Sequence, residues 1–127
     1  MGAFLESERQ RQAAFKQSSP HFSAAARADG VFKGRPRTFC LPTTNAEENL
    51  YSGIRHEAIS YFKQHGIHWH NGTGDNPSNH LCDSQVCCVN FLFPFMEQPD
   101  ALAEMLKPVY PTLKTMLPLE REGQFVA

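Results

Sequence analysis

WHNGTGDNPSNHLCDSQVCCVNFLFPF, residues 69–95, places polar side chains inside an otherwise apolar run. Burying a polar group costs free energy unless the group is hydrogen-bonded, so this mixture needs a structural or chemical reason. Asn76 before Pro77 can begin a helix with proline at its first position. The spacing of apolar residues then predicts a central, buried helix over 77–93, apolar on two adjoining faces. A core strand over 86–93 is the alternative, because short apolar runs fit both.

The flanking sequence predicts further helices. Ser7 and Gln10 have capping-box spacing, which indicates a short helix from Glu8 to Gln17. Asn45 can cap a helix over 46–65 that ends at Gly66, and a third helix is expected over 99–106. Residues 66–70 alternate like a short strand, and the apolar end, residues 124–127, resembles the start of another strand.

These elements predict a mainly α fold with short strands, in the α+β class. Residues 1–44 are expected to form an irregular N-terminal arm with one short helix, because glycine and proline interrupt any period over 18–44. Residues 45–127 are expected to form a helical module. A chain of 127 residues is enough for one hydrophobic core.

Charge and cysteine content narrow the class of protein. Lys and Arg total 12 and Asp and Glu total 13, so no strong overall field draws the chain to DNA or membranes. No apolar run approaches a membrane span, and the charged N-terminus is unlike a signal peptide. Three of the four cysteines fall within seven residues, which is no secreted disulfide framework. We therefore expect a cytoplasmic protein.

Positive charge is concentrated over residues 27–37. Arg27, Lys33, Arg35 and Arg37 stand there against Asp29 alone. Such a stretch is more often a solvated loop than a functional surface. The functional alternative is an arm that contacts phosphates, with Arg35 and Arg37 as binding residues.

A zinc site and a catalytic thiol are both suggested by residue type. The possible ligands are His68, His70, His80, Cys82, Cys87 and Cys88. The sequence has no CxxC pair, and adjacent cysteines project about 100° apart on a helix, so zinc is the weaker interpretation. A thiol nucleophile needs an exposed, electropositive position. The apolar neighbourhood instead predicts buried, reduced thiols without metal.

The polar groups of the predicted central helix have two interpretations. They either cap loops and bond one another, or they bind a ligand. The functional interpretation places Ser84 and Gln85 near a helix N-terminus, where amide donors suit a phosphate or carboxylate. Glu57 lies at the edge of the apolar stripe of the 46–65 helix and is more often a solvated side chain than a metal ligand.

Two stretches of the sequence resemble a known family. NLYSGIRHEAISYFKQHGIHWH followed by NPSNHLCDSQVCCVNFLFPF resembles the N-terminal portion of a bacterial group of PD-(D/E)XK-superfamily nuclease-like proteins. Their signature has the form HL-x-SSQ-x-x-C-x-N-x-x-x-P, with Asp83 here in place of its first serine. The matching residues are His80, Leu81, Ser84, Gln85, Cys88, Asn90 and Pro94. The resemblance covers about residues 40–127.

The resemblance implies the N-terminal helical part of a restriction-endonuclease-like α/β fold, which cuts nucleic acid with Mg²⁺ held by carboxylates. It implies binding roles for His80, Ser84, Gln85 and Asn90. Glu57 is the one position that could add an N-terminal carboxylate to such a metal site. No Glu-x-Lys occurs in the sequence, so the catalytic core is missing from these residues. We expect a module that is non-catalytic on its own, with no cofactor in this chain and Mg²⁺ only if that core were present.

Three hypotheses about function remain open. The chain is the front module of a nuclease, acting by binding nucleic acid or protein; or it is a free-standing protein-binding or inhibitor protein of mobile-element origin; or it is a small zinc-binding domain. The first predicts exposed apolar surface that a homo-oligomer or another partner would cover.

Overall fold

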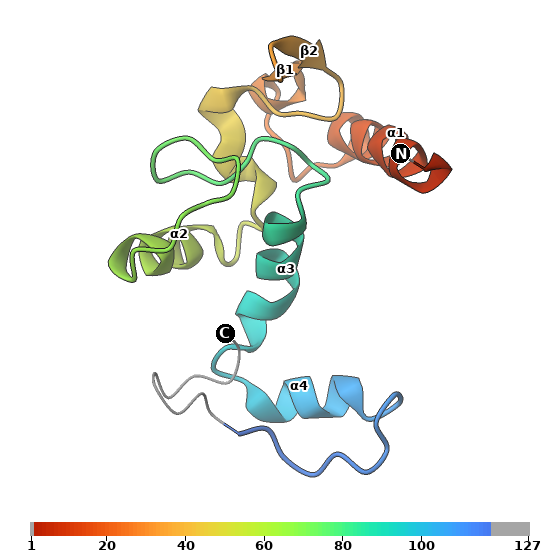
Figure 1. The fold of residues 1–127 in the computed structure, drawn as a ribbon, viewed down its shortest axis with the longest axis vertical. Coiled ribbons are helices and arrows are strands. Elements are labelled where there is room, and N and C mark those ends of the chain that lie inside the picture. Colours follow the sequence, from red (N-terminus) through yellow and green to blue (C-terminus); the bar gives the residue numbers. More distant parts are fainter. Residues whose placement is uncertain (1, 118–127) are drawn as a thin grey trace. The chain divides into compact units, whose positions relative to one another are not determined.

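The computed structural model describes residues 2–117, so the expected strand at 124–127 lies outside the described residues. Figure 1 shows the ribbon. The helices and strands confirm the mixed α+β class. In chain order they are α1 (Ala3–Ser18), the 3₁₀ helix η1 (Ala25–Arg27), β1 (Gly30–Phe32), β2 (Arg35–Arg37), the 3₁₀ helix η2 (Thr43–Asn49), α2 (Arg55–Gln64), α3 (Ser84–Leu92), the 3₁₀ helix η3 (Phe93–Phe95) and α4 (Pro99–Leu106).

The chain divides into two compact units, residues 1–89 and 90–127, so the division falls inside α3. In the second unit α4 covers the range predicted for it, with Pro99 at its first position and Asp100 in its first turn. Leu102 and Ala103 are its buried side chains. Phe91 and Phe95 of this unit meet edge to face with ring centroids 6.3 Å apart. The candidate site described below belongs entirely to the first unit.

The stretch 18–44 is more regular than expected. It contains η1 and an antiparallel hairpin in which Gly30 pairs with Arg37 and Phe32 with Arg35. Helix α1 is also longer than predicted: it begins at Ala3, so Ser7 lies inside it and Gly2 occupies the cap. The prediction of irregular chain over 18–44 is therefore wrong, whereas a domain boundary at residue 44 stays a prediction.

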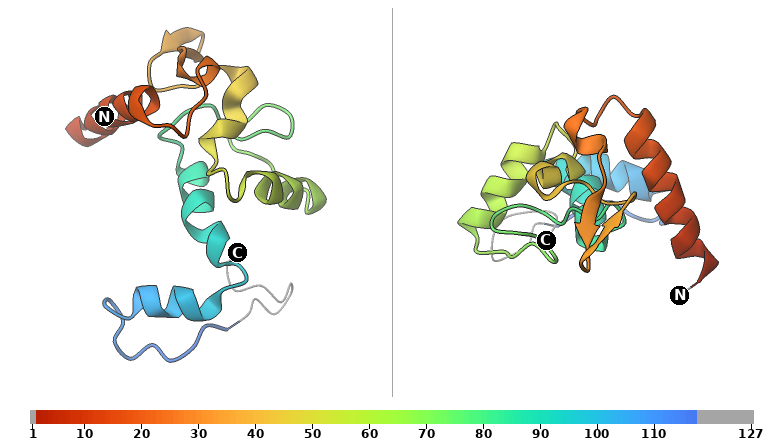
Figure 2. Two further views of the ribbon diagram at one scale, coloured as in Figure 1. Left: turned by 180° about the vertical axis from the view of Figure 1, so that it is seen from behind. Right: turned by 90° about the horizontal axis from the view of Figure 1, so that it is seen from above.

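Three segments that are distant in sequence lie side by side in the first unit. The Gly30 amide donates to the Cys40 carbonyl, and the Leu41 amide donates to the Asn79 carbonyl at 2.8 Å. The Leu81 amide in turn donates to the Phe39 carbonyl. Residues 39–41 thus connect the hairpin to residues 79–81, as the two views in Figure 2 show for the hairpin and the loop before α3. Phe22, Ala26 and Leu41 form the buried cluster beneath them, with Leu81 packed against it.

Two predicted helices are shorter than their sequence patterns suggested. Residues 46–65 divide into η2 and α2, with a turn at residues 51–54 between them. The apolar stripe is nevertheless real, because Leu50, Ile54, Ala58 and Phe62 are all buried. Phe62 stacks on Trp69 with ring centroids 3.8 Å apart. Residues 66–70 form no strand, so that prediction is wrong; Gly66 has a φ of 62°, which ends the helix instead.

The predicted central helix over 77–93 begins only at Ser84. Asp83 explains this start, because its Oδ1 accepts the Val86 amide at 3.0 Å and so caps the helix. Residues 77–83 are extended or turn instead, and the backbone of residues 79–81 pairs with residues 39–41. Val86 is the buried residue of α3, whereas Cys87 and Cys88 are exposed. The expectation of two buried faces, and of buried thiols at these two positions, is wrong.

Candidate nucleic-acid interface

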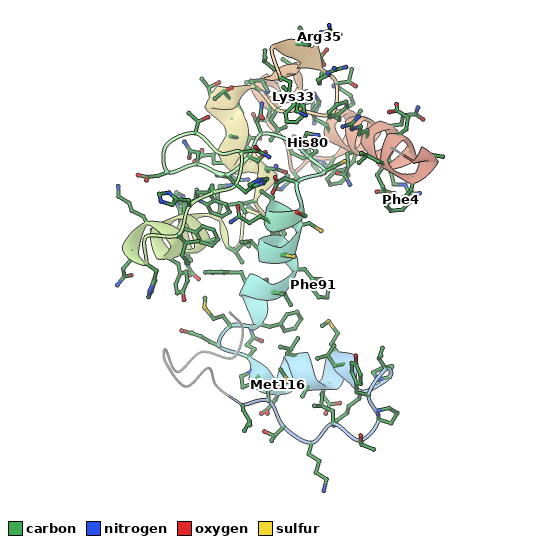
Figure 3. The ribbon with its side chains drawn as sticks, viewed as in Figure 1. Phe4, Lys33, Arg35, His80, Phe91 and Met116 are labelled. Atoms are coloured by element: carbon green, nitrogen blue, oxygen red, sulfur yellow. The ribbon has the colours of Figure 1, made fainter. Side chains whose placement is uncertain are left out.

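The β1–β2 hairpin carries a group of basic side chains on a tight turn. Its two turn residues, Lys33 and Gly34, have φ values of 50° and 74°. A two-residue type I′ turn requires positive φ at both positions, and a lysine adopts this conformation less readily than glycine. Lys33 and Arg35 are exposed and Arg37 is half-buried. We call Lys33, Arg35 and Arg37 the basic hairpin; Figure 3 labels Lys33 and Arg35 at its end.

The basic hairpin is held in place by a buried lysine of α1. Lys16 is fully buried, and its Nζ donates to the carbonyls of Ala28 and Cys40, each at 3.0 Å. The same ammonium lies 3.8 Å from Asp29 Oδ1. Burial lowers the pKa of Lys16, and Asp29 opposes that shift. Asp29 therefore pairs with Lys16 and makes no ion pair with the described side chains of Lys33, Arg35 or Arg37.

Close backbone approach fixes the base of the hairpin. A Cβ placed on Gly30 would lie 1.9 Å from the Leu41 carbonyl oxygen, so only glycine permits this contact. The Asn79 side chain adds two hydrogen bonds from Nδ2, to the carbonyls of Val31 at 3.2 Å and Leu41 at 2.8 Å. The hairpin is thus tied at both its start and its middle to the rest of the first unit.

Three rings lie in a row beneath the hairpin. His80 contacts Phe32 with centroids 4.8 Å apart and Phe39 with centroids 4.9 Å apart. A cation stands at each end, because Lys33 Nζ is 5.4 Å from the Phe32 centroid and Arg9 Cζ is 4.6 Å from the Phe39 centroid. We call Phe32, His80 and Phe39 the aromatic row. Through these contacts the aromatic row connects β1 to Arg9 of α1.

The tautomer of His80 follows from its hydrogen bond. The Cys82 amide donates to His80 Nδ1 at 3.0 Å, so the neutral ring carries its proton on Nε2. Burial lowers the pKa of His80, and the Arg9 charge adds to this shift while Asp83 opposes it. Burial also raises the pKa of the Cys40 thiol to about 11. These groups are structural at neutral pH: the imidazole is an acceptor and the thiol is protonated.

The other residues singled out by sequence lie apart from the hairpin turn. Gln85 fastens the loop before it, accepting from the His70 amide at 2.7 Å and donating to the His68 carbonyl at 3.0 Å. Ser84 is exposed and Asn90 half-buried, on α3. Glu57 is exposed in the first turn of α2. Their proposed binding and catalytic roles stay predictions.

Metal-binding geometry is absent from the described part of the chain. Across residues 2–117, no group of three or more His, Cys, Asp or Glu side chains is placed to hold a metal ion. The exposed carboxylate of Glu57 has no such partners there, so these residues do not fit a Mg²⁺ site of the kind that the resemblance implies. The cysteines 40, 82, 87 and 88 are free. Within the same residues, no helix is long and apolar enough to cross a membrane.

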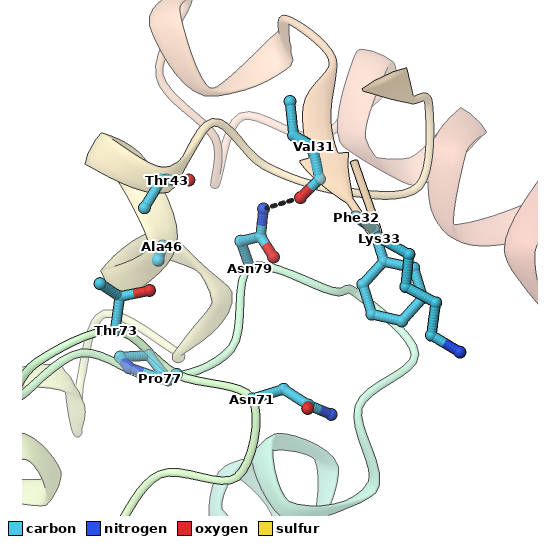
Figure 4. A pocket seen from close by; sticks show the side chains of 10 residues that line it. Val31, Phe32, Lys33, Thr43, Ala46, Asn71, Thr73, Pro77 and Asn79 are labelled. Atoms are coloured by element: carbon cyan, nitrogen blue, oxygen red, sulfur yellow. Dashed lines mark hydrogen bonds between the residues drawn. The ribbon is translucent and has the colours of Figure 1, made fainter. Parts of the chain in front are cut away.

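A cleft opens between the hairpin and the loop before α3, and of its lining residues only Lys33 belonged to a stretch for which sequence analysis considered a binding role. Its volume is about 520 Å³. Its walls come from three segments, as Figure 4 shows: the hairpin, the start of η2 and the loop 71–79. The lining residues are Val31, Phe32, Lys33, Thr43, Ala46, Asn71, Gly72, Thr73, Pro77 and Asn79.

Comparison with known families agrees with the restriction-endonuclease connection. Residues 9–121 match the model of a family described as "Restriction Endonuclease associating with ARP". This chain belongs to that family. The match covers the second part of α1, the basic hairpin, the cleft and most of both compact units. It supports a restriction-endonuclease-related family without reaching to the PD-(D/E)XK superfamily or its signature. No curated protein and no solved structure matched the sequence.

Proposed function

We propose that this chain is a binding module of a restriction-endonuclease-related protein and that it contacts the phosphates of nucleic acid through the basic hairpin. The single observation that carries the proposal is that the hairpin cations have no ion-pair partner among the described residues. Within residues 2–117, Lys33, Arg35 and Arg37 form no ion pair, and the Lys33 ammonium lies over the face of the Phe32 ring.

Most basic side chains elsewhere in the described residues have polar partners, although Arg9 and Lys114, like those of the hairpin, form no ion pair. Arg11 pairs with Glu8 at 2.9 Å, Lys63 pairs with Asp75 at 3.0 Å, and Lys107 pairs with Glu104. Arg27 and Arg55 donate to the carbonyls of Ser19 and Leu50. Cations without anionic partners on a rigid, projecting turn are suited to phosphate groups, which supply most of the affinity in nucleic-acid binding.

The strained turn supports the same proposal. A lysine with φ of 50° occupies a conformation that costs free energy and persists only where the surroundings enforce it. Here Lys16, Gly30 and Asn79 make contacts that hold the backbone before the turn and at residues 40–41. Because the backbone of the turn is already ordered, binding costs entropy in the side chains only, which favours a contact surface over a solvated loop.

We further propose that the chain is non-catalytic on its own and that it derives from the PD-(D/E)XK superfamily. Phosphodiester cleavage with Mg²⁺ needs several oxygen ligands on one ion. The exposed position of Glu57 and the lack of a ligand cluster in residues 2–117 support binding rather than cleavage. In this proposal His80 positions the aromatic row, whereas Ser84 and Gln85 lie on α3 as further candidate contacts of the first unit.

A protein partner is the second candidate. It is favoured by the family description, which names an association with ARP. Phe4 on α1 is 77% exposed and offers apolar surface in the first unit for such a contact.

The test of nucleic-acid binding compares two variants of equal net charge. Lys33→Gln/Arg35→Gln removes two hairpin cations, and Lys63→Gln/Lys114→Gln removes two cations elsewhere. Both variants reach a formal net charge of about −3 from −1, so the overall field of the protein changes equally. Fluorescence anisotropy with a labelled oligonucleotide at low salt measures the dissociation constant of each.

The proposal predicts that the hairpin variant binds about tenfold more weakly than the wild type, while the control stays within about threefold. Equal weakening of both variants would show that only net charge matters. Wild-type protein that binds neither duplex nor single strand, yet captures a protein partner through α1, would favour the second candidate.

A further inference from the structure

We infer that the cleft beside the basic hairpin receives one unpaired nucleobase, whose flanking phosphate lies on Lys33. This inference rests on the proposed function and adds the form of nucleic acid that the site selects. The cleft volume of about 520 Å³ falls in the usual range of small-molecule sites, about 300–1,000 Å³.

The lining has the chemistry of a nucleobase site. Its ten residues include two amides, two threonine hydroxyls and the Phe32 ring, but no carboxylate. Lys33 is the one cation among them and belongs to the turn of the hairpin. Neutral polar groups beside a smaller apolar surface suit the edge of a nucleobase, and the Lys33 cation among them suits the phosphate attached to it.

Asn79 supplies an acceptor of fixed direction. Both of its Nδ2 protons are used, one on the Val31 carbonyl and one on the Leu41 carbonyl. These two bonds determine which end of the amide is nitrogen, and they leave Oδ1 to accept from a ligand. In Figure 4 this oxygen lies on the side of the amide turned away from Val31. A base edge that carries an amino or imino N–H would complement it.

The cleft wall formed by residues 71–77 is also held in place by contacts within the chain. Asn71 has a φ of 56° and its Nδ2 lies 3.2 Å from His70 Nδ1, which holds the second amide in place. A Cβ on Gly72 would lie 2.2 Å from the Asn76 carbonyl oxygen, so the loop is tightly folded. Thr73 and Asn76 form an isolated β-bridge, and Pro77 beyond them is buried.

The shape of the site excludes a base that remains stacked and paired. A base enters a concave site only after it leaves the duplex, whereas a single strand presents its bases at once. The basic hairpin alone would bind both forms through their phosphates. The cleft therefore predicts a preference for single-stranded over double-stranded nucleic acid.

The test fills the cleft and leaves the cations untouched. Thr43 lines the cleft at the start of η2 and is exposed, so Thr43→Trp inserts an indole into the base site. Thr44 is exposed and does not line the cleft, so Thr44→Trp is the matched control. Anisotropy with a twelve-nucleotide mixed-sequence DNA strand and its duplex gives four dissociation constants for the two variants. Equal melting temperatures establish that both variants are folded.

We expect Thr43→Trp to weaken single-strand binding about tenfold and to leave duplex binding unchanged, with Thr44→Trp altering neither. In the wild type, the side-chain amide ¹H–¹⁵N signals of Asn71 and Asn79 should shift when the single strand is added. Unchanged single-strand binding by a folded Thr43→Trp variant, or amide signals that stay still, would overturn the inference while leaving phosphate binding by the hairpin intact. Failure of Lys33→Gln/Arg35→Gln to weaken either form would overturn both.

Discussion

At the scale of single residues, Lys16 has a structural role that its sequence context does not predict. It stands in α1 between Phe15 and Gln17, where a surface lysine would be the ordinary expectation. The fold instead buries its ammonium and directs it to two backbone carbonyls at the base of the hairpin. No local pattern distinguishes this lysine, because its partners come from residues 12 and 24 positions away.

Replacing Lys16 with methionine tests that role. The change keeps much of the side-chain volume but removes two charge-assisted hydrogen bonds, so we expect the free energy of unfolding to fall by about 2 kcal/mol. Lys63→Met is the control, because Lys63 is 70% exposed and its pair with Asp75 is worth less than about 1 kcal/mol. Urea denaturation measures both. Equal losses in the two variants would contradict an anchoring role.

His80 makes stability depend on pH. Its pKa in the folded protein is lowered from the unfolded value of about 6.5, first by burial and then by Arg9, while Asp83 opposes the shift. Below about pH 6.5 the unfolded chain therefore binds the proton more readily than the folded one. The stabilisation is complete above that pH and is lost as the pH falls through the folded-state pKa.

The measurement is the free energy of unfolding at pH 7.5 and 5.5 for the wild type, His80→Gln and His56→Gln. His56 is exposed on α2 and serves as the control. We expect the wild type and His56→Gln to lose more stability on acidification than His80→Gln. Parallel losses in all three proteins would rule out the contribution of His80.

At the scale of helices and strands, α3 depends on one capping residue. Asp83 Oδ1 accepts the Val86 amide, and Asp83 is itself 8% exposed. Asp83→Ala removes the acceptor and should lower the free energy of unfolding by about 1–2 kcal/mol. Asp83→Asn keeps an acceptor in the same place and should cost much less. Thermal unfolding compares the two; an asparagine variant as unstable as the alanine variant would point to the negative charge rather than the cap.

The helices also show which helix bounds could be predicted from sequence patterns and which could not. The α4 range was predictable because Pro99, Asp100 and its apolar spacing are local signals. The break between η2 and α2 was not, because Asn49 Nδ2 donates to the carbonyls of Ser78 and His80 and so uses a tertiary contact to hold η2. The late start of α3 has the same origin, since the backbone of residues 79–81 pairs with residues 39–41 instead of forming helix. Tertiary pairing overrides a local helical pattern in both places.

The candidate site was predictable in part. The run of basic residues over 27–37 predicted the hairpin cations, whereas the hairpin itself was not predicted, because Lys33-Gly34 is not one of the dipeptides that commonly signal such a turn. The cleft was not predictable, because its walls come from three segments that meet only in the folded chain. Asn79 is the clearest case: its sequence neighbours suggested a helix, whereas its role follows from carbonyls 38 and 48 positions away.

At the scale of the whole molecule, we predict that the chain alone does not cut nucleic acid. Plasmid DNA, single-stranded DNA and RNA should remain intact on incubation with Mg²⁺ or Mn²⁺, because residues 2–117 contain no cluster of ligands for the ion. Gel electrophoresis of the products checks this. Cleavage that vanishes in Glu57→Ala, in protein free of contaminating nuclease, would show that a catalytic site is present after all.

Phosphate contact by the basic hairpin is the central claim about this molecule, and its most direct test is the salt dependence of binding. The logarithm of the association constant for a DNA duplex falls linearly with the logarithm of salt concentration, by about 0.9 for each phosphate contacted. Loss of the Lys33 and Arg35 contacts should therefore make the slope about 1.8 less steep in Lys33→Gln/Arg35→Gln than in the wild type. The Lys63→Gln/Lys114→Gln control should keep the wild-type slope. A hairpin variant whose slope equals that of the wild type would contradict the claim that these side chains bind phosphate.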